Sequence, residues 1–106
     1  MHALSAKHLK LLVDYFKTVS QIDRVILFGS RAMGNHKKGS DIDLAVSGPI
    51  DARLLIKIGR VLNDELPISL KFDVVHLGSI AHPDLKKHIE QEGQVIYRRE
   101  ENPKTL

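Results

Sequence analysis

The chain contains no cysteine and no tryptophan, and only 5% of its 106 residues are aromatic. Without cysteine there is no disulfide framework, no thiolate zinc site and no thiol nucleophile. The scarcity of aromatic rings argues against a platform on which nucleic-acid bases stack. No apolar run approaches the ~20 residues that span a bilayer, and the N-terminal segment MHALSAKHLK lacks the hydrophobic region of a signal peptide. We therefore expect a cytoplasmic protein with neither a membrane partner nor a nucleic-acid partner.

The composition is that of a small globular domain. Hydrophobic residues make up 42% of the chain, which is enough to build a packed interior. The length of 106 residues falls within the common size range of one domain, and no repeat or linker divides it, so we expect a single domain over residues 1–106. The formal net charge of +3 is mildly basic and compatible with binding a polyanion such as a triphosphate.

Hydrophobic periodicity predicts alternating helices and strands. Apolar residues at helical spacing predict helices over residues 5–19, 52–65 and 83–92, with Ser5, Asp51 and Pro83 at their starts. Continuous or alternating apolar runs predict strands over residues 24–28, 41–46, 72–77 and 94–97. The catalytic core would then span residues 24–77, followed by a helix and strand over residues 82–97.

The stretch from Arg24 to Val46 carries the chemistry. A buried strand ends at Gly29-Ser30, and ten residues later Asp41-Ile42-Asp43 opens a second strand, whose alternation puts both carboxylates on one face. Two adjacent carboxylates repel each other, and Mg²⁺, which prefers oxygen ligands, is their natural occupant. Glycine permits close approach of a ligand, and a short helix beginning at Ser30 and ending near residue 34 would offer N–H groups to phosphate.

The connections bring these parts together and add a third acid. Ten residues are short for a parallel crossover, so the first two strands should pair antiparallel. The strand–helix–strand unit that follows predicts a right-handed crossover between parallel neighbours, which places Asp73 near the start of the second strand. An unpaired polar group buried in so apolar a strand would cost about 2–7 kcal/mol, so we interpret Asp73 as the third acidic ligand. His76 faces the other way and is interpreted as structural.

These residues resemble a known family. Gly29-Ser30, ten residues and Asp41-x-Asp43, with Asp73 on a later strand, are similar to the polymerase-β-like nucleotidyltransferase superfamily. The short length and the segments GSRAMG, SDIDLAV and FDVVHL resemble the minimal nucleotidyltransferases, the MNT antitoxins that are paired with HEPN toxins in prokaryotes. The resemblance implies an α/β (α+β) nucleotidyltransferase fold, with a mixed sheet of about four strands and helices packed mainly on one face.

The resemblance also assigns roles to individual residues. It implies nucleotide contacts at four positions: Gly29, Ser30, Arg31 and Ser40. It implies three catalytic carboxylates that hold two Mg²⁺ ions: Asp41, Asp43 and Asp73. Two assignments have alternatives, since Arg31 could form a structural ion pair and Ser40 could simply close the loop.

The implied reaction is transfer of a nucleoside monophosphate, AMP from ATP, to a hydroxyl with release of pyrophosphate. The acceptor implied is a tyrosine of a HEPN toxin encoded nearby. Two alternatives stay open: transfer to a small molecule or RNA end with a separate substrate-binding subunit, and a non-catalytic antitoxin that neutralises its partner by binding. So small a domain should have an open site completed by another chain, so we expect a homo- or hetero-oligomer.

Overall fold

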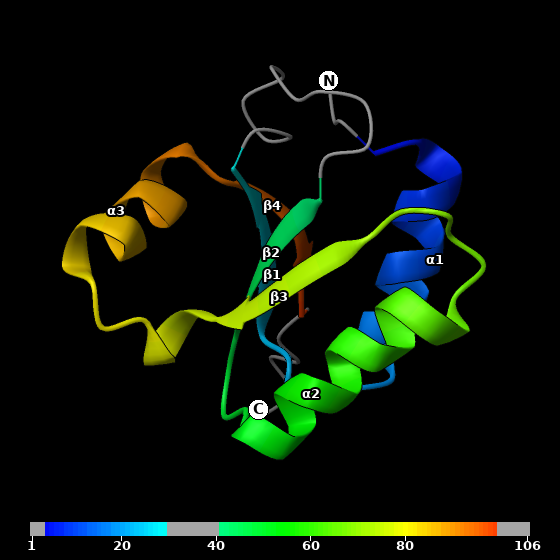
Figure 1. Ribbon diagram of the computed structural model, residues 1–106, viewed down its shortest axis with the longest axis horizontal. Helices are drawn as coiled ribbons and strands as arrows, with labels where there is room; N and C mark the ends of the chain where they lie inside the picture. Colours follow the sequence, from blue (N-terminus) through cyan, green and yellow to red (C-terminus); the bar gives the residue numbers. More distant parts are fainter. Residues whose placement is uncertain (1–3, 30–40, 100–106) are drawn as a thin grey trace, which may run out of the picture.

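The computed structural model describes residues 4–29 and 41–99, and the short helix expected at residues 30–34 lies outside them. The described residues form a four-stranded sheet of order β3-β2-β1-β4 with helices on both sides (Figure 1). The elements in chain order are α1 (Ala6–Lys17), β1 (Arg24–Phe28), β2 (Ile42–Ser47), α2 (Ala52–Arg60), a π-helical turn η1 (Val61–Glu65), β3 (Phe72–His76), a 3-10 turn η2 (Leu77–Ser79), α3 (Pro83–Glu92) and β4 (Gln94–Arg98).

The strand pairing confirms the predicted topology. β1 pairs antiparallel with both β2 and β4, whereas β2 and β3 run parallel and are joined through α2. The end of β1 therefore lies beside the start of β2, with Phe28 opposite Asp43. β3 begins at that same end of the sheet, with Phe72 beside Ile42.

The two faces of the sheet are covered unequally, which confirms that the helices pack mainly on one face. α1 and α2 lie on one side and α3 alone on the other (Figure 1). The larger core cluster fills the α1–α2 side, with side chains from β1, β2, β3 and both helices. The buried residues of the smaller cluster on the α3 side are Ile26, Ala45, Leu77 and Ile89. The α3 side is thus thinly covered and leaves part of its sheet face accessible.

Several element boundaries differ from the sequence-based expectation. α1 begins after Ser5, whose hydroxyl accepts a hydrogen bond from the His8 N–H at 3.1 Å. It ends at Thr18 because that hydroxyl donates to the Tyr15 carbonyl at 2.7 Å and so competes with continuation of the helix. The expected helix over residues 52–65 changes to π geometry in its last turn, over Val61–Glu65.

His76 has the structural role expected of it. Its Nε2 donates to the Gly48 carbonyl at 2.9 Å, and its Nδ1 lies 2.7 Å from the Ser79 hydroxyl. A carbonyl can only accept, so Nε2 carries a proton. The end of β3 is thereby tied to the turn that follows β2.

Within residues 4–29 and 41–99, no helix has the length and apolar character needed to cross a bilayer.

Candidate active site

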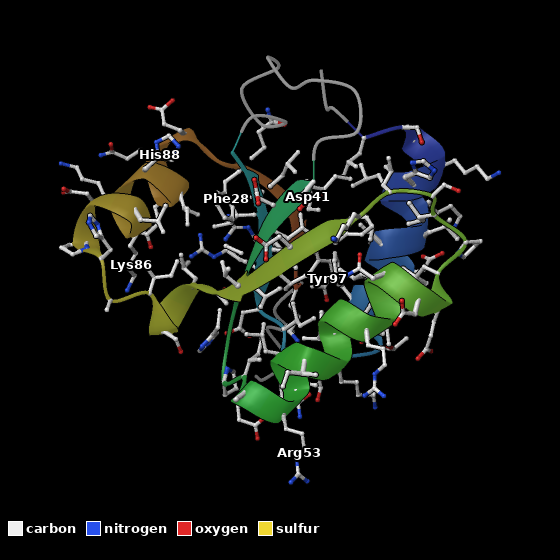
Figure 2. The ribbon with its side chains drawn as sticks, viewed as in Figure 1. Phe28, Asp41, Arg53, Lys86, His88 and Tyr97 are labelled. Atoms are coloured by element: carbon white, nitrogen blue, oxygen red, sulfur yellow. The ribbon has the colours of Figure 1, made fainter. Side chains whose placement is uncertain are left out.

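The parallel pairing of β2 and β3 sets two carboxylates side by side. Asp43 and Asp73 are register partners in these neighbouring strands. By the two-residue alternation of a strand, they share the face of Ala45 and Val75, which is the α3 side of the sheet. Asp41 precedes Asp43 by two residues, immediately before β2, and Figure 2 shows it at the same end of the sheet as Phe28.

These acids are more accessible than the sequence suggested. Asp41 and Asp73 are exposed, and Asp43 is half-buried between them and the end of β1. The expectation that Asp73 lies in a buried strand is wrong, because β3 is the outer strand of the sheet and α3 does not cover this end of it. The acidic face is therefore open to a ligand.

The glycine corner after β1 presses against the central carboxylate. Gly29 has a φ of 80°, in the left-handed region that favours glycine. A Cβ at this position would collide with Oδ2 of Asp43 and lie 3.2 Å from its Cγ. The glycine corner therefore lies directly against the acidic pair. Ser30, Arg31 and Ser40, the other predicted nucleotide contacts, lie outside the described residues.

The environment of Asp43 disfavours the ionised form of its carboxyl group. Burial raises the pKa of the Asp43 carboxyl, and the negative charges of Asp73 and Asp41 raise it further. Phe28 is the register partner of Asp43 on β1, so its side chain lies next to that of Asp43 on the same face of the sheet. Sequence reasoning missed this neighbour, although the predicted antiparallel pairing of the two strands was a signal that could have identified it.

The donor set fits a hard divalent cation in its chemistry. The negative charges of Asp41 and Asp73 raise the pKa of Asp43, and within residues 4–29 and 41–99 none of the three carboxylates forms an ion pair. Carboxylate oxygens are ligands that suit Mg²⁺. Across the described residues, however, no three acidic or other metal-ligating side chains converge closely enough to hold an ion as they stand. The structure thus brings Asp43 and Asp73 together and places Asp41 beside them without closing a metal site.

This arrangement has a limited chemical repertoire. The chain has no cysteine, so the site has neither a thiol nucleophile nor a thiolate ligand. What the site offers is a cluster of hard anionic oxygens next to a tight glycine corner. Such a site can gather a cation and a phosphate ester and can accept a proton at an exposed carboxylate.

Comparison with known proteins agrees with this geometry. Residues 10–102 match the family described as "Polymerase beta, Nucleotidyltransferase". A Methanocaldococcus jannaschii protein named "Putative protein adenylyltransferase" is 36% identical over 88 residues, covering 81% of this chain and 84% of the relative. A second protein of the same name and organism is 35% identical over 88 residues, with the same two coverages.

Solved structures share the fold. A toxin–antitoxin crystal structure with AMP-PNP superposes with a TM-score of 0.69 at 23% identity and covers 92% of this chain and 76% of that chain. A tri-AMPylated Shewanella oneidensis HEPN toxin in complex with an MNT antitoxin gives a TM-score of 0.59 at 20% identity, with coverages of 86% and 73%.

Proposed function

Because the chain belongs to the polymerase β-type nucleotidyltransferase family, we propose that it transfers AMP from ATP to a hydroxyl of a partner protein. The observation that carries this proposal is the Asp43–Asp73 pair in adjacent parallel strands, with Gly29 pressed against Asp43. Asp73 is exposed and Asp43 half-buried on the thinly covered face of the sheet. The site can therefore admit both a nucleotide and a bulky acceptor.

In the proposed reaction, each residue has a distinct task. The acceptor oxygen attacks the α-phosphorus, the bond from that phosphorus to the bridging oxygen breaks, and pyrophosphate leaves. Asp41, Asp43 and Asp73 would hold Mg²⁺, which neutralises triphosphate charge when bound. An oxygen of the exposed Asp73 carboxylate would take the proton that the acceptor hydroxyl loses. The corner at Gly29 would let the backbone approach the phosphates, so the protein acts chiefly by positioning.

The acceptor that we propose is a tyrosine of a HEPN-type toxin. Relatives at 35–36% identity are named as protein adenylyltransferases, and one neighbour of the same fold was solved with an AMPylated HEPN toxin. A tyrosine hydroxyl on a folded partner needs an accessible site, which the exposed Asp41 and Asp73 provide. The chain would then act as an antitoxin by modifying its partner.

The test is a transfer assay on the chain co-purified with the HEPN-type protein encoded beside it. We expect ATP and Mg²⁺ to convert the partner to an AMP-modified form, with the modification mapped to tyrosine by mass spectrometry. Asp43→Asn should abolish the conversion, because it removes one anionic metal ligand while keeping the shape of the side chain.

Three results would contradict the proposal. Full transfer by Asp43→Asn would remove the acidic site from the mechanism. Tight binding to the toxin with no modification under any nucleotide would indicate an antitoxin that acts by covering its partner. Modification of an added RNA end or small hydroxyl compound, with the toxin untouched, would indicate a different acceptor class.

A further inference from the structure

Asp73, the proposed metal ligand, lies near the start of β3, at an edge of the sheet. β3 is one of the two edge strands of the sheet, so one side of its backbone has no neighbouring strand. Asp73 is only the second residue of this strand. Strand ends at a free edge open easily, because few hydrogen bonds restrain them. Something other than the sheet must hold this end if Asp73 is to stay beside Asp43.

Asn63, from the π-helical turn η1, fills this place. Its side-chain oxygen accepts from the Phe72 N–H at 2.7 Å, and its side-chain nitrogen donates to the Phe72 carbonyl at 3.0 Å. One amide thus pairs with both backbone groups of one residue, as a neighbouring strand would. The same nitrogen also donates to the Gly59 carbonyl at 3.0 Å, which ties the amide back to α2.

The residues around Asp73 are consequently held from both sides. On the inner side, the Lys71 carbonyl accepts from the Ile42 N–H at 2.8 Å, and Asp73 lies in register with Asp43. On the outer side, Asn63 holds Phe72. The Phe72 side chain is 4% exposed and anchors the strand in the core. The position of the Asp73 backbone therefore depends on the Asn63 amide.

We propose that Asn63 is a positioning residue that sets Asp73 against Asp43 for binding of the catalytic cation. This inference rests on the proposed function, since it assumes that Asp73 is a metal ligand. Asn63 touches neither nucleotide nor acceptor in this assignment and acts only through the Phe72 backbone. The π geometry of η1 agrees with such a role, because π turns occur often at functional sites.

The expected effect is on cation affinity, measured without substrate. In Asn63→Ala, β3 loses both bonds at Phe72, and Asp73 no longer has a fixed place beside Asp43. We expect the dissociation constant for Mn²⁺, titrated alone and followed by electron paramagnetic resonance, to rise about 10-fold, the lower end for loss of a residue that orients a ligand. The Mg²⁺ concentration for half-maximal transfer should rise by a similar factor.

A matched control separates positioning from general loss of stability. Asp51→Ala removes a side-chain bond of the same kind, in which Asp51 accepts from the Leu54 N–H at 2.8 Å, at the opposite end of α2. It should leave Mn²⁺ affinity unchanged at any temperature where it is folded. Asp73→Asn should weaken Mn²⁺ binding by itself, and adding Asn63→Ala to it should cause no further loss, because Asn63 would then have no ligand to position.

The possible results distinguish failure of the metal role of Asp73 from failure of the positioning role of Asn63. If Asp73→Asn leaves Mn²⁺ binding unchanged, the proposed metal role of Asp73 fails, and this inference fails with it. If Asp73→Asn weakens binding but Asn63→Ala does not, only the positioning role of Asn63 is overturned. Equal losses in Asn63→Ala and Asp51→Ala, or additive losses in the double variant, would also overturn it.

Discussion

Asp43 is the residue of the proposed site at which its chemistry opposes the stability of the fold. Its carboxylate is half-buried beside Phe28, faces two other carboxylates and has a raised pKa. We predict that Asp43→Asn stabilises the cation-free protein at neutral pH by about 0.5–1 kcal/mol, the scale of measured exposed charge interactions. For a domain of this size this corresponds to roughly 2–8 °C in Tm, measurable by thermal denaturation in a chelator. A lower Tm for the variant would contradict this prediction.

The same residue makes this stability difference depend on pH. The folded-state pKa of Asp43 lies above its unfolded value, so the folded protein holds this proton more tightly. The protonated form favours folding at low pH, and that contribution is lost as the pH rises through the folded pKa. We therefore expect the advantage of Asp43→Asn to shrink as the pH falls and to vanish below the ordinary aspartate pKa of about 3.9. Denaturant unfolding of the wild type and Asp43→Asn across pH measures this stability difference. A stability gain in Asp43→Asn that persists in acid would contradict the prediction.

Gly29 is the second residue on which the site depends. Gly29→Ala would force a side chain into the left-handed region, at a cost of about 1–2 kcal/mol, and would push the Asp43 carboxylate away. Since small misplacements at a reacting centre can cost ~100-fold in rate, we expect transfer to fall by about that factor.

The control for this variant lies at the other end of β2. Gly48 also has a positive φ, of 128°, and a Cβ there would collide with the backbone carbonyl of Gln21, so Gly48→Ala should be at least as destabilised as Gly29→Ala. Its transfer rate per folded molecule should stay close to that of the wild type. Equal rate losses in the two variants would contradict a specific role for Gly29.

At the scale of elements, the attachment of α3 depends on its C-terminal glycine. A Cβ at Gly93 would meet Ile26 and the Ile89 carbonyl and would lie 3.2 Å from the Leu27 carbonyl. Ile89 is the one fully buried residue of α3, so this junction holds the helix on its face of the sheet. We predict that Gly93→Ala lowers the free energy of unfolding by about 1–3 kcal/mol, as overpacked sites do.

A second glycine supplies the comparison. Gly59 lies inside α2, and a Cβ there would meet nothing within 4 Å. Gly59→Ala should therefore stabilise the protein by about 0.5–1 kcal/mol through the higher helix propensity of alanine. Chemical denaturation of both variants checks the pair, and a loss of stability in Gly59→Ala would contradict the prediction.

Element types and pairing could be predicted from the sequence because they depend on local patterns. The short connection between the first two strands was sufficient to predict that they pair antiparallel, and the strand–helix–strand unit that follows predicted the parallel crossover. The outer position of β3 was not predicted, so Asp73 was expected in a buried strand. The pairing of the Asn63 amide with Phe72 was not predicted either, because it depends on a π turn that no local propensity indicates.

At the scale of the whole molecule, unequal covering of the sheet links fold to function. Two helices and the larger core lie on one face, and the other face carries α3 and, beyond it, the acidic site (Figure 1). The larger core is thus separated from the end of the sheet that carries the acidic residues. The net charge of +3 also lowers the cost of bringing a triphosphate toward three carboxylates.

The most direct test of the central claim compares two labels on ATP. The site is proposed to transfer the α-phosphorus with its nucleoside and to release pyrophosphate. With Mg²⁺ and the co-purified partner, label on the α-phosphate should appear on the partner, whereas label on the γ-phosphate should not, and Asp43→Asn should show neither. Transfer of the γ-label, or α-label transfer that survives Asp43→Asn, would contradict nucleotidyl transfer at this acidic site.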